Sequence, residues 1–448
     1  MSGGRRIAIV GSGISGMLAA AELHRAGHKV TMFEAGDYAG GHTNTVTVDE
    51  PSGPVDVDTG FIVFNDRNYP NFESMLAELG VASQPANMSF GVSDGDGGFE
   101  WAARGARGIF ARPRHLVDPR FIRMLSDLVR FNRDARDLVA ANGSGPSLRD
   151  FLDDGRYSDY FIDRLIVPQV SAVWSADPEQ MWSFPASFLA AFFENHGVLQ
   201  IRNRPRWRSI PGGSRRYVAA LTAPFADRIR LRTPVHRVRR LPDAGVAVAH
   251  DDGEERFDEV VLACHADQAL AMLAEPNRLE RDLLAAFPYQ SNEAVLHTDT
   301  ALMPRRRGAW ASWNFHLTDE PAGRTTVTYD MNRLQSLVCS ERYLVTLNRT
   351  EAIDPARVIR RIDYAHPVFT KRGVSAQGRW AEISGVDRVH YCGAYWRWGF
   401  HEDGAWSALR VAAALGGRGP GLTATAPPAT AADRADRHDR LEPVLEAA

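Results

Sequence analysis

Residues 7–34, IAIVGSGISGMLAAAELHRAGHKVTMFE, constrain the fold of this chain more than any other stretch. A short β-branched strand enters a glycine turn, an alanine-rich helix follows, and a second strand ends at an acidic residue. Gly11 permits the tight turn, Gly13 lets a pyrophosphate approach the backbone, and Gly16 lets helix and strand pack closely. The pattern predicts a Rossmann-like unit that binds a dinucleotide.

Two further features of this unit support a dinucleotide site. Ile14 and Ser15 open the helix, so its N-terminus offers free N–H groups to anionic oxygens. Glu34 lies 23 residues beyond Gly11 and is followed by Ala35, and its carboxylate can accept hydrogen bonds from ribose hydroxyls. A glycine-rich turn in another kind of α/β protein is the alternative, which the strand, helix and acidic residue together disfavour.

The composition, 44% hydrophobic and 24% charged, is that of a soluble protein, and the length of 448 residues predicts two or three domains or one domain with a large insertion. The net charge of −3 gives no overall attraction to nucleic acid or to an anionic membrane. Arg5 and Arg6 lead into the first strand without an apolar signal segment, and no apolar run approaches the ~20 residues of a membrane span. Three cysteines without CxxC spacing, Cys264, Cys339 and Cys392, predict a cytoplasmic location and no metal site.

The stretch after Glu34 resembles a known family. Gly40 and Gly41, followed by His42 and Thr43, resemble the second glycine pair of the amine oxidase, phytoene desaturase and protoporphyrinogen oxidase superfamily. In that family the pair approaches the diphosphate or the flavin of FAD. The wider family often has arginine after the pair, so His42 implies altered flavin electrostatics or, as an alternative, covalent attachment. No familiar cysteine flavinylation motif is present, so we expect noncovalent FAD.

The next block, VDVDTGFIVFNDRNYPN, is similar to the stretch with which this family passes the flavin. Asp58, Gly60 and Asn65 are its polar and small positions. Enzymes that bind only NAD lack this continuation, so the resemblance implies FAD. No second glycine fingerprint lies between a strand and a helix, which argues against an NADPH site. Oxygen, a quinone and a carrier protein stay open as electron acceptors.

A matching segment lies near the C-terminus. In VHYCGAYWRWGFHEDGAWSALRVAAALGG we expect a strand at 388–392, Gly393 at its exit, and a helix opened by Gly404 and Ala405. In the superfamily this segment returns the chain to the dinucleotide domain and points a helix N-terminus at the flavin, where larger side chains would collide with the cofactor. An ordinary strand and helix is the alternative.

The resemblance implies an α/β fold, in which a discontinuous Rossmann-like FAD-binding domain carries an inserted α+β substrate-binding domain. Residues 209–221, SIPGGSRRYVAAL, look like the return from the substrate domain, and Val235 would present its backbone to the adenine. We assign the FAD-binding domain to 1–90, 206–275 and 385–417, the substrate-binding domain to 91–205 and 276–384, and a disordered tail to 418–448.

Several runs, among them SAVWSADPEQMWSFPASFLAAFFENHGVL, VTYDMNRLQSL and GFHEDG, resemble a narrower bacterial group of amine-oxidase-like proteins. Some members of this group are associated with cyclopropane or methyl-branched fatty acids. The resemblance, over residues 5–417, implies a FAD-dependent oxidoreductase that takes a hydride from a hydrophobic substrate and desaturates a methylated fatty acyl chain. Two alternatives are a flavin amine oxidase that makes imine and hydrogen peroxide, and a redox-silent FAD protein that docks on lipid.

The C-terminal segment also supplies the candidate catalytic residues. Tyr395 and Trp398 offer aromatic walls, which suit an amine or an acyl chain. His401 could relay a proton, and Glu402 could lie beside the flavin. Capping of the following helix is the alternative for Glu402 and Asp403. An amine substrate would further imply an aromatic pair or a lysine–water relay.

Two histidines and one basic stretch have alternative interpretations. His196 and His297 could line the substrate cavity, or could be hydrogen-bonded structural residues. Residues 100–136 hold nine arginines interleaved with Trp101, Ile109, Phe110 and Phe121, and could dock on anionic lipid if the substrate is an acyl lipid. A solvated basic helix face is the alternative. No nucleic-acid motif accompanies the stretch, so we expect no nucleic-acid partner.

Overall fold

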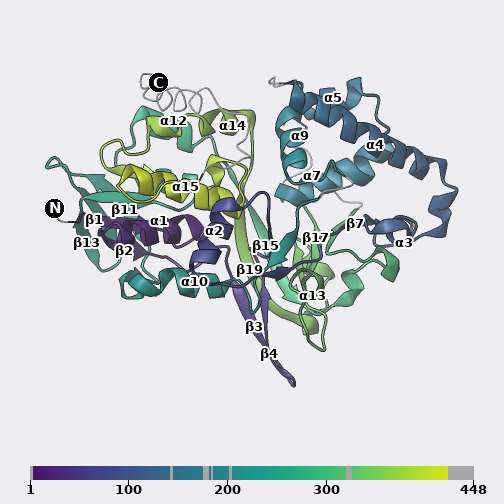
Figure 1. Cartoon of the computed structure of the whole chain (residues 1–448), viewed down its shortest axis with the longest axis horizontal. Coiled ribbons are helices and arrows are strands. Elements are labelled where there is room, and N and C mark those ends of the chain that lie inside the picture. The colour runs from purple at the N-terminus through teal and green to yellow at the C-terminus, as the bar shows by residue number, and fades with distance from the viewer. Residues whose placement is uncertain are drawn as a thin grey trace, which may run out of the picture.

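Two lobes, each with its own hydrophobic core, make up the structure (Figure 1). It is a computed structural model and describes residues 4–141, 145–174, 181–182, 185–200, 204–318 and 325–421. The first lobe holds the beginning and the end of the described chain, and the second lobe carries most of the long central helices (Figure 1). The α/β fold expected from the sequence is confirmed.

The first lobe centres on a five-stranded parallel sheet. Its strand order is β10-β2-β1-β14-β20, so three segments that are distant in the sequence lie side by side. The consecutive residues Ile7, Ala8 and Ile9 are fully buried, as expected for a parallel strand covered on both faces. The strands are β1 (Arg6–Val10), β2 (Lys29–Phe33), β10 (Ile229–Arg230), β14 (Glu259–Leu262) and β20 (Val389–Tyr391).

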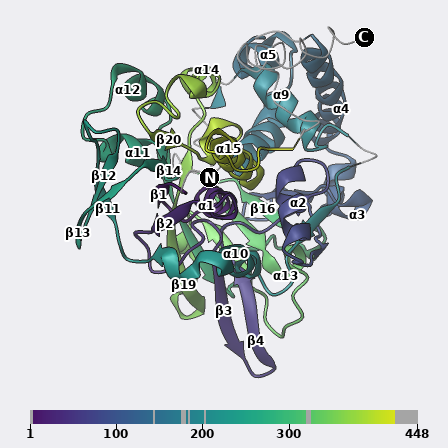
Figure 2. The ribbon, with the colours of Figure 1, turned by 60° about the vertical axis from the view of Figure 1, so that its left-hand side comes forward.

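Two helices from opposite ends of the sequence pack against each other in this lobe (Figure 2). Helix α1 (Ile14–Arg25) follows the glycine turn, and α15 (His401–Ala414) follows β20. They touch at Gly404, where a Cβ atom would lie 2.8 Å from Ile14 Cγ2. Ser15 Oγ donates a hydrogen bond to Gly404 O at 3.1 Å. The close approach joins the C-terminal segment to the glycine turn.

Smaller elements surround this sheet. Two antiparallel sheets have three strands each, in the orders β11-β12-β13 and β5-β9-β6, and a β3–β4 hairpin projects below the middle of the molecule (Figure 1). The strands are β3 (Thr45–Glu50), β4 (Gly53–Asp58), β5 (Phe64–Asn65), β6 (Gln84–Pro85), β9 (Trp207–Ser209), β11 (Val235–Arg240), β12 (Val246–His250) and β13 (Gly253–Phe257). The helices are α2 (Pro70–Glu78), α10 (Arg215–Thr222), α11 (Ala266–Met272), α12 (Arg278–Leu284) and α14 (Lys371–Gln377).

The second lobe combines a seven-stranded mixed sheet, in the order β19-β15-β18-β17-β16-β7-β8, with a layer of helices. The strands are β7 (Phe90–Ser93), β8 (Glu100–Ala102), β15 (Tyr289–His297), β16 (Trp313–His316), β17 (Val327–Asp330), β18 (Leu344–Leu347) and β19 (Val358–Pro367). The helices are α3 (Gly105–Ile109), α4 (Pro119–Ala140), α5 (Leu148–Asp154), α6 (Asp159–Phe161), α7 (Val167–Trp174), α9 (Ala186–Asn195) and α13 (Met331–Leu334), with a π-helical turn at Ile162–Ile166.

The C-terminal segment departs from the prediction at its element boundaries. Strand β20 spans Val389–Tyr391 and not 388–392. Helix α15 begins at His401 instead of Gly404, so Glu402 and Asp403 belong to its first turn. Beyond residue 421 the predicted tail lies outside the described residues, and the domain boundaries stay a prediction. Within the described part of the chain, no helix has both the length and the apolar composition needed to cross a bilayer.

Candidate active site

A cavity of about 760 Å³ lies where strands β1, β2 and β14 end. Val10, Phe33 and Ala263 mark these strand ends on its wall. In open α/β sheets, ligands bind at the carboxyl ends of the parallel strands. Residues of both hydrophobic cores line the cavity, which therefore continues from the parallel sheet to the second lobe.

The glycine turn leaves one end of the cavity open to an anion. Helix α1 begins at Ile14 without a side-chain cap, so no side chain occupies its N-terminal N–H groups. A Cβ atom on Gly13 would meet no other part of the chain within 4 Å, so a ligand can approach the backbone there. Gly41, with a φ of +58°, lies against this turn, because its Cβ atom would be 3.1 Å from Gly13 Cα. The two glycine segments form one cradle.

Glu34 braces this cradle from the end of β2. One carboxylate oxygen accepts hydrogen bonds from Ser12 N at 2.9 Å and Ser12 Oγ at 2.5 Å, and the other accepts from Gly36 N at 2.7 Å. Ser12 Oγ also accepts from Gly40 N at 3.2 Å. The carboxylate lines the cavity, as expected of a ribose-binding residue, and it also orders the glycine turn.

Apolar residues enclose the cavity beside Glu34. Thr233 N donates to Glu34 O at 2.8 Å, which brings Pro234 and Val235 next to the cradle. Met272, at the end of α11, lines the same cavity. An apolar end next to a carboxylate suits a heterocyclic base attached to a ribose.

His42 and two residues of β19 form the middle of the wall. The His42 ring stacks on Tyr364, with centroids 4.8 Å apart, and its centroid lies 5.1 Å from that of His366. Gly60 permits the close approach of the loops, since a Cβ atom there would be 2.2 Å from His42 O. His42 Nε2 is buried without a hydrogen-bond partner. An unpaired nitrogen on a cavity wall is a group that a bound ligand or water satisfies.

A buried hydrogen-bond chain runs from the wall into the first lobe. His401 Nε2 lies 2.7 Å from Tyr217 Oη, which lies 2.6 Å from Thr43 Oγ1. Phe61 stacks on His401 with centroids 3.6 Å apart and ring planes 9° apart, which holds the imidazole plane. Tyr217 and Thr43 do not line the cavity, so they act on it through His401.

Burial keeps the histidines of this wall neutral. It lowers the pKa of His401 to about 3 and, with a smaller contribution from His265, that of His366 to about 4. Burial also lowers the pKa of His265. The pKa of His42 lies well below its usual range because of burial first and its histidine neighbours second. At neutral pH these imidazoles are neutral donors and acceptors of hydrogen bonds.

Two asparagines set the tautomer of His366. Asn292 Oδ1 accepts from Asn348 Nδ2 at 2.7 Å, which turns Asn292 Nδ2 toward His366 Nδ1 at 2.9 Å. Because Nδ1 accepts this hydrogen bond, the neutral ring carries its proton on Nε2. His366 is thus a donor with a fixed orientation.

Aromatic and aliphatic side chains enclose the end of the cavity in the second lobe. Trp313 of β16 and Tyr329 of β17 meet edge to face, with centroids 5.0 Å apart. Such pairs are favourable beyond the area they bury. The other apolar residues of this end are Ile62, Val63, Ala172, Val173, Trp207, Leu347, Phe369, Trp398 and Phe400.

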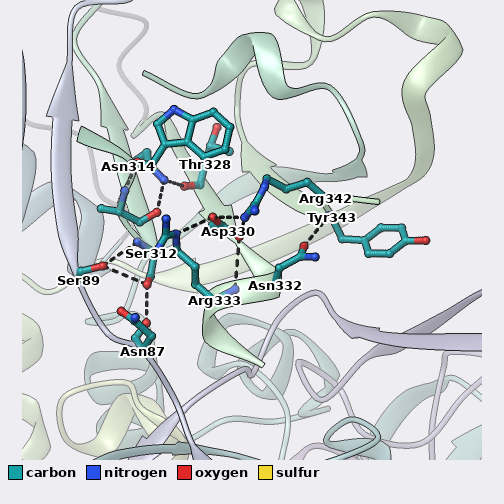
Figure 3. A network of polar contacts seen from close by, with 12 residues as sticks. Asn87, Ser89, Ser312, Asn314, Thr328, Asp330, Asn332, Arg333, Arg342 and Tyr343 are labelled. Atoms are coloured by element: carbon teal, nitrogen blue, oxygen red, sulfur yellow. Dashed lines mark hydrogen bonds and ion pairs between the residues drawn. The ribbon is translucent and has the colours of Figure 1, made fainter. Parts of the chain in front are cut away.

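A polar network holds the same strands from behind (Figure 3). Side chains alternate along a strand, so the neighbours of Trp313 and Tyr329 point away from the cavity. Among them, Asp330 accepts from Arg333 Nε at 2.9 Å and from Arg342 at 2.7 Å. On the adjacent strand, Asn314 Nδ2 donates to Thr328 O at 3.1 Å. These bonds fix the strands that carry the aromatic wall.

The cavity wall carries almost no charge. Among the described residues that line it, Glu34 is the one carboxylate, and none is arginine or lysine. The two lysines of the chain, Lys29 and Lys371, lie outside the wall. The described wall therefore lacks the lysine–water relay that an amine substrate would imply. Nor do the residues that the structure describes include a cluster of histidine, cysteine and acidic residues able to hold a metal ion.

The structure brings most of the predicted site residues together on this wall. They are Gly11, Gly13, Ile14, Ser15, Glu34, Ala35, Gly40, Gly41, His42, Gly60, Val235, Gly393, Tyr395, Trp398 and His401. The others, Gly16, Thr43, Gly404, Ala405 and Glu402, lie behind it. Gly16 and Gly404 are packing positions: a Cβ atom on Gly16 would be 1.9 Å from Gly11 O. These residues support the site without facing it.

Glu402 faces helix α2 instead of the cavity. Its carboxylate accepts from Asn71 N at 3.1 Å, Asn71 Nδ2 at 2.6 Å and Phe72 N at 3.0 Å, and burial raises its pKa to about 7. Asp403 caps its own helix by accepting from Phe400 N at 2.8 Å. Successive helical residues point about 100° apart, so His401 can line the cavity while Glu402 cannot. Capping of the following helix therefore describes Asp403, whereas Glu402 caps helix α2.

The two other candidate histidines also have structural partners. His196 Nδ1 bonds to Phe192 O at 3.0 Å, and His297 Nε2 bonds to Thr346 Oγ1 at 2.8 Å. Neither lines the large cavity. Their positions match the structural alternative.

The polar and aromatic residues of the site that were not predicted include Phe61, Tyr217, His265, Tyr364 and His366. Phe61 and Tyr217 lie inside stretches with the family resemblance, so their position was available as a signal. Tyr364 and His366 are two residues apart in β19, and strand alternation places them on one face. The pattern alone does not say whether that face borders a cavity or a core.

The residues present fit FAD. The uncapped N-terminus of α1 and the open backbone at Gly13 suit a diphosphate, and the apolar end beside Glu34 suits the adenosine. The unpaired His42 Nε2 and the neutral, aromatic middle of the wall suit a flavin ring. One cavity of this volume spans all of these features.

Comparisons with known proteins agree with this geometry. The family model described as flavin containing amine oxidoreductase matches residues 14–333. A putative flavin-containing monoamine oxidase of Mycobacterium tuberculosis is 27% identical over 287 residues, which cover 60% of this chain and 59% of the relative. A carotenoid phi-ring synthase of Streptomyces griseus is 29% identical over 287 residues, which cover 57% and 52%. The chain thus spans somewhat more than half the length of these curated relatives.

A solved structure extends the likeness over the whole fold. Cyclohexylamine oxidase from Brevibacterium oxydans IH-35A matches 92% of this chain and 98% of its own, with a TM-score of 0.68 and 19% sequence identity. At this identity the match shows a shared fold.

Proposed function

Because the chain belongs to the family of flavin containing amine oxidoreductases, we propose that it is a FAD-dependent oxidoreductase that acts on an apolar substrate. We propose further that this substrate is a fatty acyl chain, methylated or not, which is desaturated by loss of a hydride and a proton. The observation that carries the substrate class is the uncharged aromatic and aliphatic end of the cavity in the second lobe. The resemblance of several runs to a bacterial group associated with methyl-branched fatty acids supports an acyl chain.

Electrostatics favour an uncharged reacting group. Moving an ammonium group into an apolar cavity is costly unless a carboxylate or another strong partner meets it there. Glu34, the one carboxylate on the described wall, lies at the opposite end, beside the glycine turn. An alkyl chain has no such cost, and its burial is favourable by roughly 0.8 kcal/mol for each CH₂ group.

The residues of the chain have distinct tasks in this proposal. Bound FAD supplies the acceptor of the hydride. The glycine cradle holds the diphosphate, and the aromatic wall positions the alkyl chain and excludes water. His401 and His366 are neutral groups with fixed orientations, and His366 can donate a hydrogen bond through Nε2 to a group bound at the wall. The Tyr217–Thr43 pair orients His401.

A flavin amine oxidase is the second candidate. It is favoured by the relative from Mycobacterium tuberculosis, which is named as a putative monoamine oxidase, and by the aromatic wall, which can face a neutral or cationic amine. Such an enzyme would bind the amine in its uncharged form, since the described wall offers no carboxylate at that end.

Anaerobic flavin reduction tests the proposal. The purified holoprotein is mixed with a methyl-branched acyl lipid, an unbranched acyl lipid or a primary amine, and the absorbance of oxidised flavin is followed. We expect the acyl lipids to bleach the flavin and to yield a product that has lost two hydrogens by mass spectrometry. Bleaching by the amine alone, with hydrogen peroxide formed in air, would favour the second candidate. If light reduces the flavin but none of the three substrates does, the result would indicate a redox-silent protein.

A matched pair of variants locates the substrate. Val173 lines the apolar end of the cavity, and Val338 is 99% exposed on the outer surface. We expect Val173→Arg to retain FAD and to raise the KM for the acyl lipid at least tenfold, because the guanidinium occupies apolar space. Val338→Arg should leave both properties unchanged.

A further inference from the structure

Helix α4 begins at one corner of the second lobe (Figure 1). Apolar residues on this helix and just before it are exposed. Leu116 and Val117, at the end of the 3₁₀ turn Pro113–Leu116, are 58% and 81% exposed. Ile122 and Val129 on α4 are 46% and 65% exposed. Burial of such residues in a partner is favourable, and large exposed apolar residues that gather in one place mark interaction sites. We call residues 105–136 the basic corner.

The apolar residues of α4 occupy two opposite faces. Phe121, Met124 and Phe131 are buried and pack into the second lobe. Ile122 and Val129 are seven residues apart, which places them on one face two turns from each other, and this face points to solvent. Packing into the core explains the apolar residues of the buried face. The apolar residues of the exposed face, Ile122 and Val129, have no partner in the described chain.

The observed burial changes which apolar residues of this stretch can contact a lipid surface. The sequence placed Trp101, Ile109, Phe110 and Phe121 among the arginines as candidate lipid contacts, but Trp101 and Phe121 are buried and the other two are partly buried against the core. The exposed apolar residues of the basic corner are instead Ile122 and Val129, which α4 turns outward, and Leu116 and Val117, which precede this helix. Their exposure does not depend on the reaction in the cavity.

The charge of the basic corner is opposite to that of the chain. It holds eight arginines and three aspartates, a net charge of +5, whereas the whole chain carries −3. One of the aspartates, Asp127, is buried and bonded to Arg130 and Ser158. The side chains of Arg120, Arg123 and Arg133 are 72%, 64% and 68% exposed. Long arginine side chains can reach anionic groups while their neighbours enter an apolar phase.

We propose that the basic corner docks the protein on an anionic lipid bilayer, with Leu116, Val117 and Ile122 entering the headgroup–acyl boundary and the surrounding arginines meeting lipid phosphates. Positive charge beside exposed apolar residues matches the two layers of such a surface. A nucleic acid or another polyanion could pair with the arginines, but it would offer no apolar phase in which Val117 and Leu116 could be buried. The proposal is independent of the proposed function, because none of these residues lines the cavity.

Vesicle binding of the full-length holoprotein tests the proposal. Cosedimentation is measured with vesicles of phosphatidylcholine alone and with vesicles that contain phosphatidylserine. We expect at least tenfold stronger binding to the anionic vesicles, which added salt weakens. Two variants should each lower this binding at least tenfold: Val117→Asp, which removes an apolar contact, and the triple change Arg114→Gln, Arg120→Gln and Arg133→Gln, which removes charge.

Matched controls come from parts of the surface outside the basic corner. Val338→Asp changes an even more exposed valine, and Arg278→Gln changes an arginine that is 92% exposed on α12, in the first lobe (Figure 2). Both should bind anionic vesicles like the unaltered protein. Equal losses in Val117→Asp and Val338→Asp, or equal binding to the two kinds of vesicle, would overturn the proposal. The proposal would also be overturned if the arginine variant lost vesicle binding while Val117→Asp bound fully, because charge alone would then explain the binding. Circular dichroism and bound FAD verify that each variant is folded.

Discussion

At the scale of single residues, the three glycines of the first turn have different physical tasks. Gly11 adopts a φ of +102°, which favours glycine on conformational grounds alone. Gly16 has no room for a side chain, since its Cβ atom would lie 1.9 Å from Gly11 O. Gly13 has ordinary helix-cap angles and open space in front of it. The conformation and packing of the chain therefore require glycine at positions 11 and 16. At position 13 only a bound ligand explains the glycine.

This difference gives a residue-level prediction. Gly13→Ala should leave the free energy of unfolding of the FAD-free protein within about 0.5 kcal/mol of its original value, because the new methyl group meets no part of the chain. The same change should weaken FAD binding at least tenfold. Gly16→Ala should destabilise the protein by about 3 kcal/mol or more, through a clash with the backbone. Urea unfolding and flavin titration measure the two effects.

An unaltered affinity for FAD in Gly13→Ala would contradict this account of the cradle. Loss of stability in that variant would place Gly13 with Gly16 as a packing residue. The contrast between the two alanine variants is the control, because both changes add the same atoms to the same turn.

Single residues also mark the limit of sequence-based prediction. The spacing of the glycines and of Glu34 predicted the residues that line the dinucleotide end of the cavity, because that spacing reflects local backbone geometry. The neighbours His401 and Glu402 could not be separated in the same way. Which of them faces the cavity depends on where α15 begins and which helix packs beside it, and both depend on distant residues.

At the scale of elements, the contact between α15 and α2 fixes the orientation of His401. Glu402 supplies the acceptor for N–H groups at the start of α2, which has no cap of its own from Tyr69. Asp403 caps α15 itself. One helical turn thus caps two helices while it presents His401 to the cavity.

Loss of this cap should cost stability without removing the site. Glu402→Gln keeps one acceptor oxygen but turns an amide toward the N–H groups of Asn71 and Phe72. We expect the free energy of unfolding to fall by about 1–3 kcal/mol. FAD should still bind, since Glu402 does not line the cavity. Thermal unfolding and flavin content are the measurements.

Glu382→Gln is the matched control for this prediction. Glu382 is exposed and pairs with Arg379 at 2.7 Å, and surface pairs of this kind contribute little. If the two variants were equally stable, Glu402 would not be the cap that the structure shows. If Glu402→Gln lost its flavin while remaining folded, the carboxylate would have a direct role in the site.

Elements also show why part of the site escaped prediction. Strand β19 carries Tyr364 and His366 to the wall, yet it pairs with β15 in the second lobe and is distant in sequence from both glycine segments. Its alternation predicts a strand with two faces. Which face meets the cavity is decided by packing between lobes, which no local pattern encodes.

At the scale of the whole molecule, buried histidines couple the fold to pH. Burial lowers the pKa of His401 and His316 to about 3, and that of His196, His297 and His366 to about 4. An unfolded histidine titrates near 6.5, so between this value and about 4 the unfolded chain binds more protons than the folded chain. Each of these histidines therefore stabilises the fold above pH 6.5 and loses this contribution as the pH falls.

Three buried acids act in the opposite direction. Burial raises the pKa of Asp58 and Asp403 to about 6 and that of Glu402 to about 7, so the folded chain binds more protons at these groups than the unfolded chain does. Their contribution to stability is complete below about pH 4 and is lost as the pH rises toward 7. The displaced histidines outnumber these acids, so the histidines decide the net slope.

We therefore expect the free energy of unfolding to fall as the pH is lowered from about 7 to about 5, by at most roughly 1.4 kcal/mol per pH unit for each histidine that takes up a proton on unfolding. Urea unfolding at several pH values measures this slope. His297→Gln removes one such histidine away from the cavity and should make the slope shallower, whereas Glu402→Gln removes an opposing acid and should make it steeper. A stability that rises on acidification would show that the buried carboxyl groups, and not the histidines, dominate the proton balance of the fold.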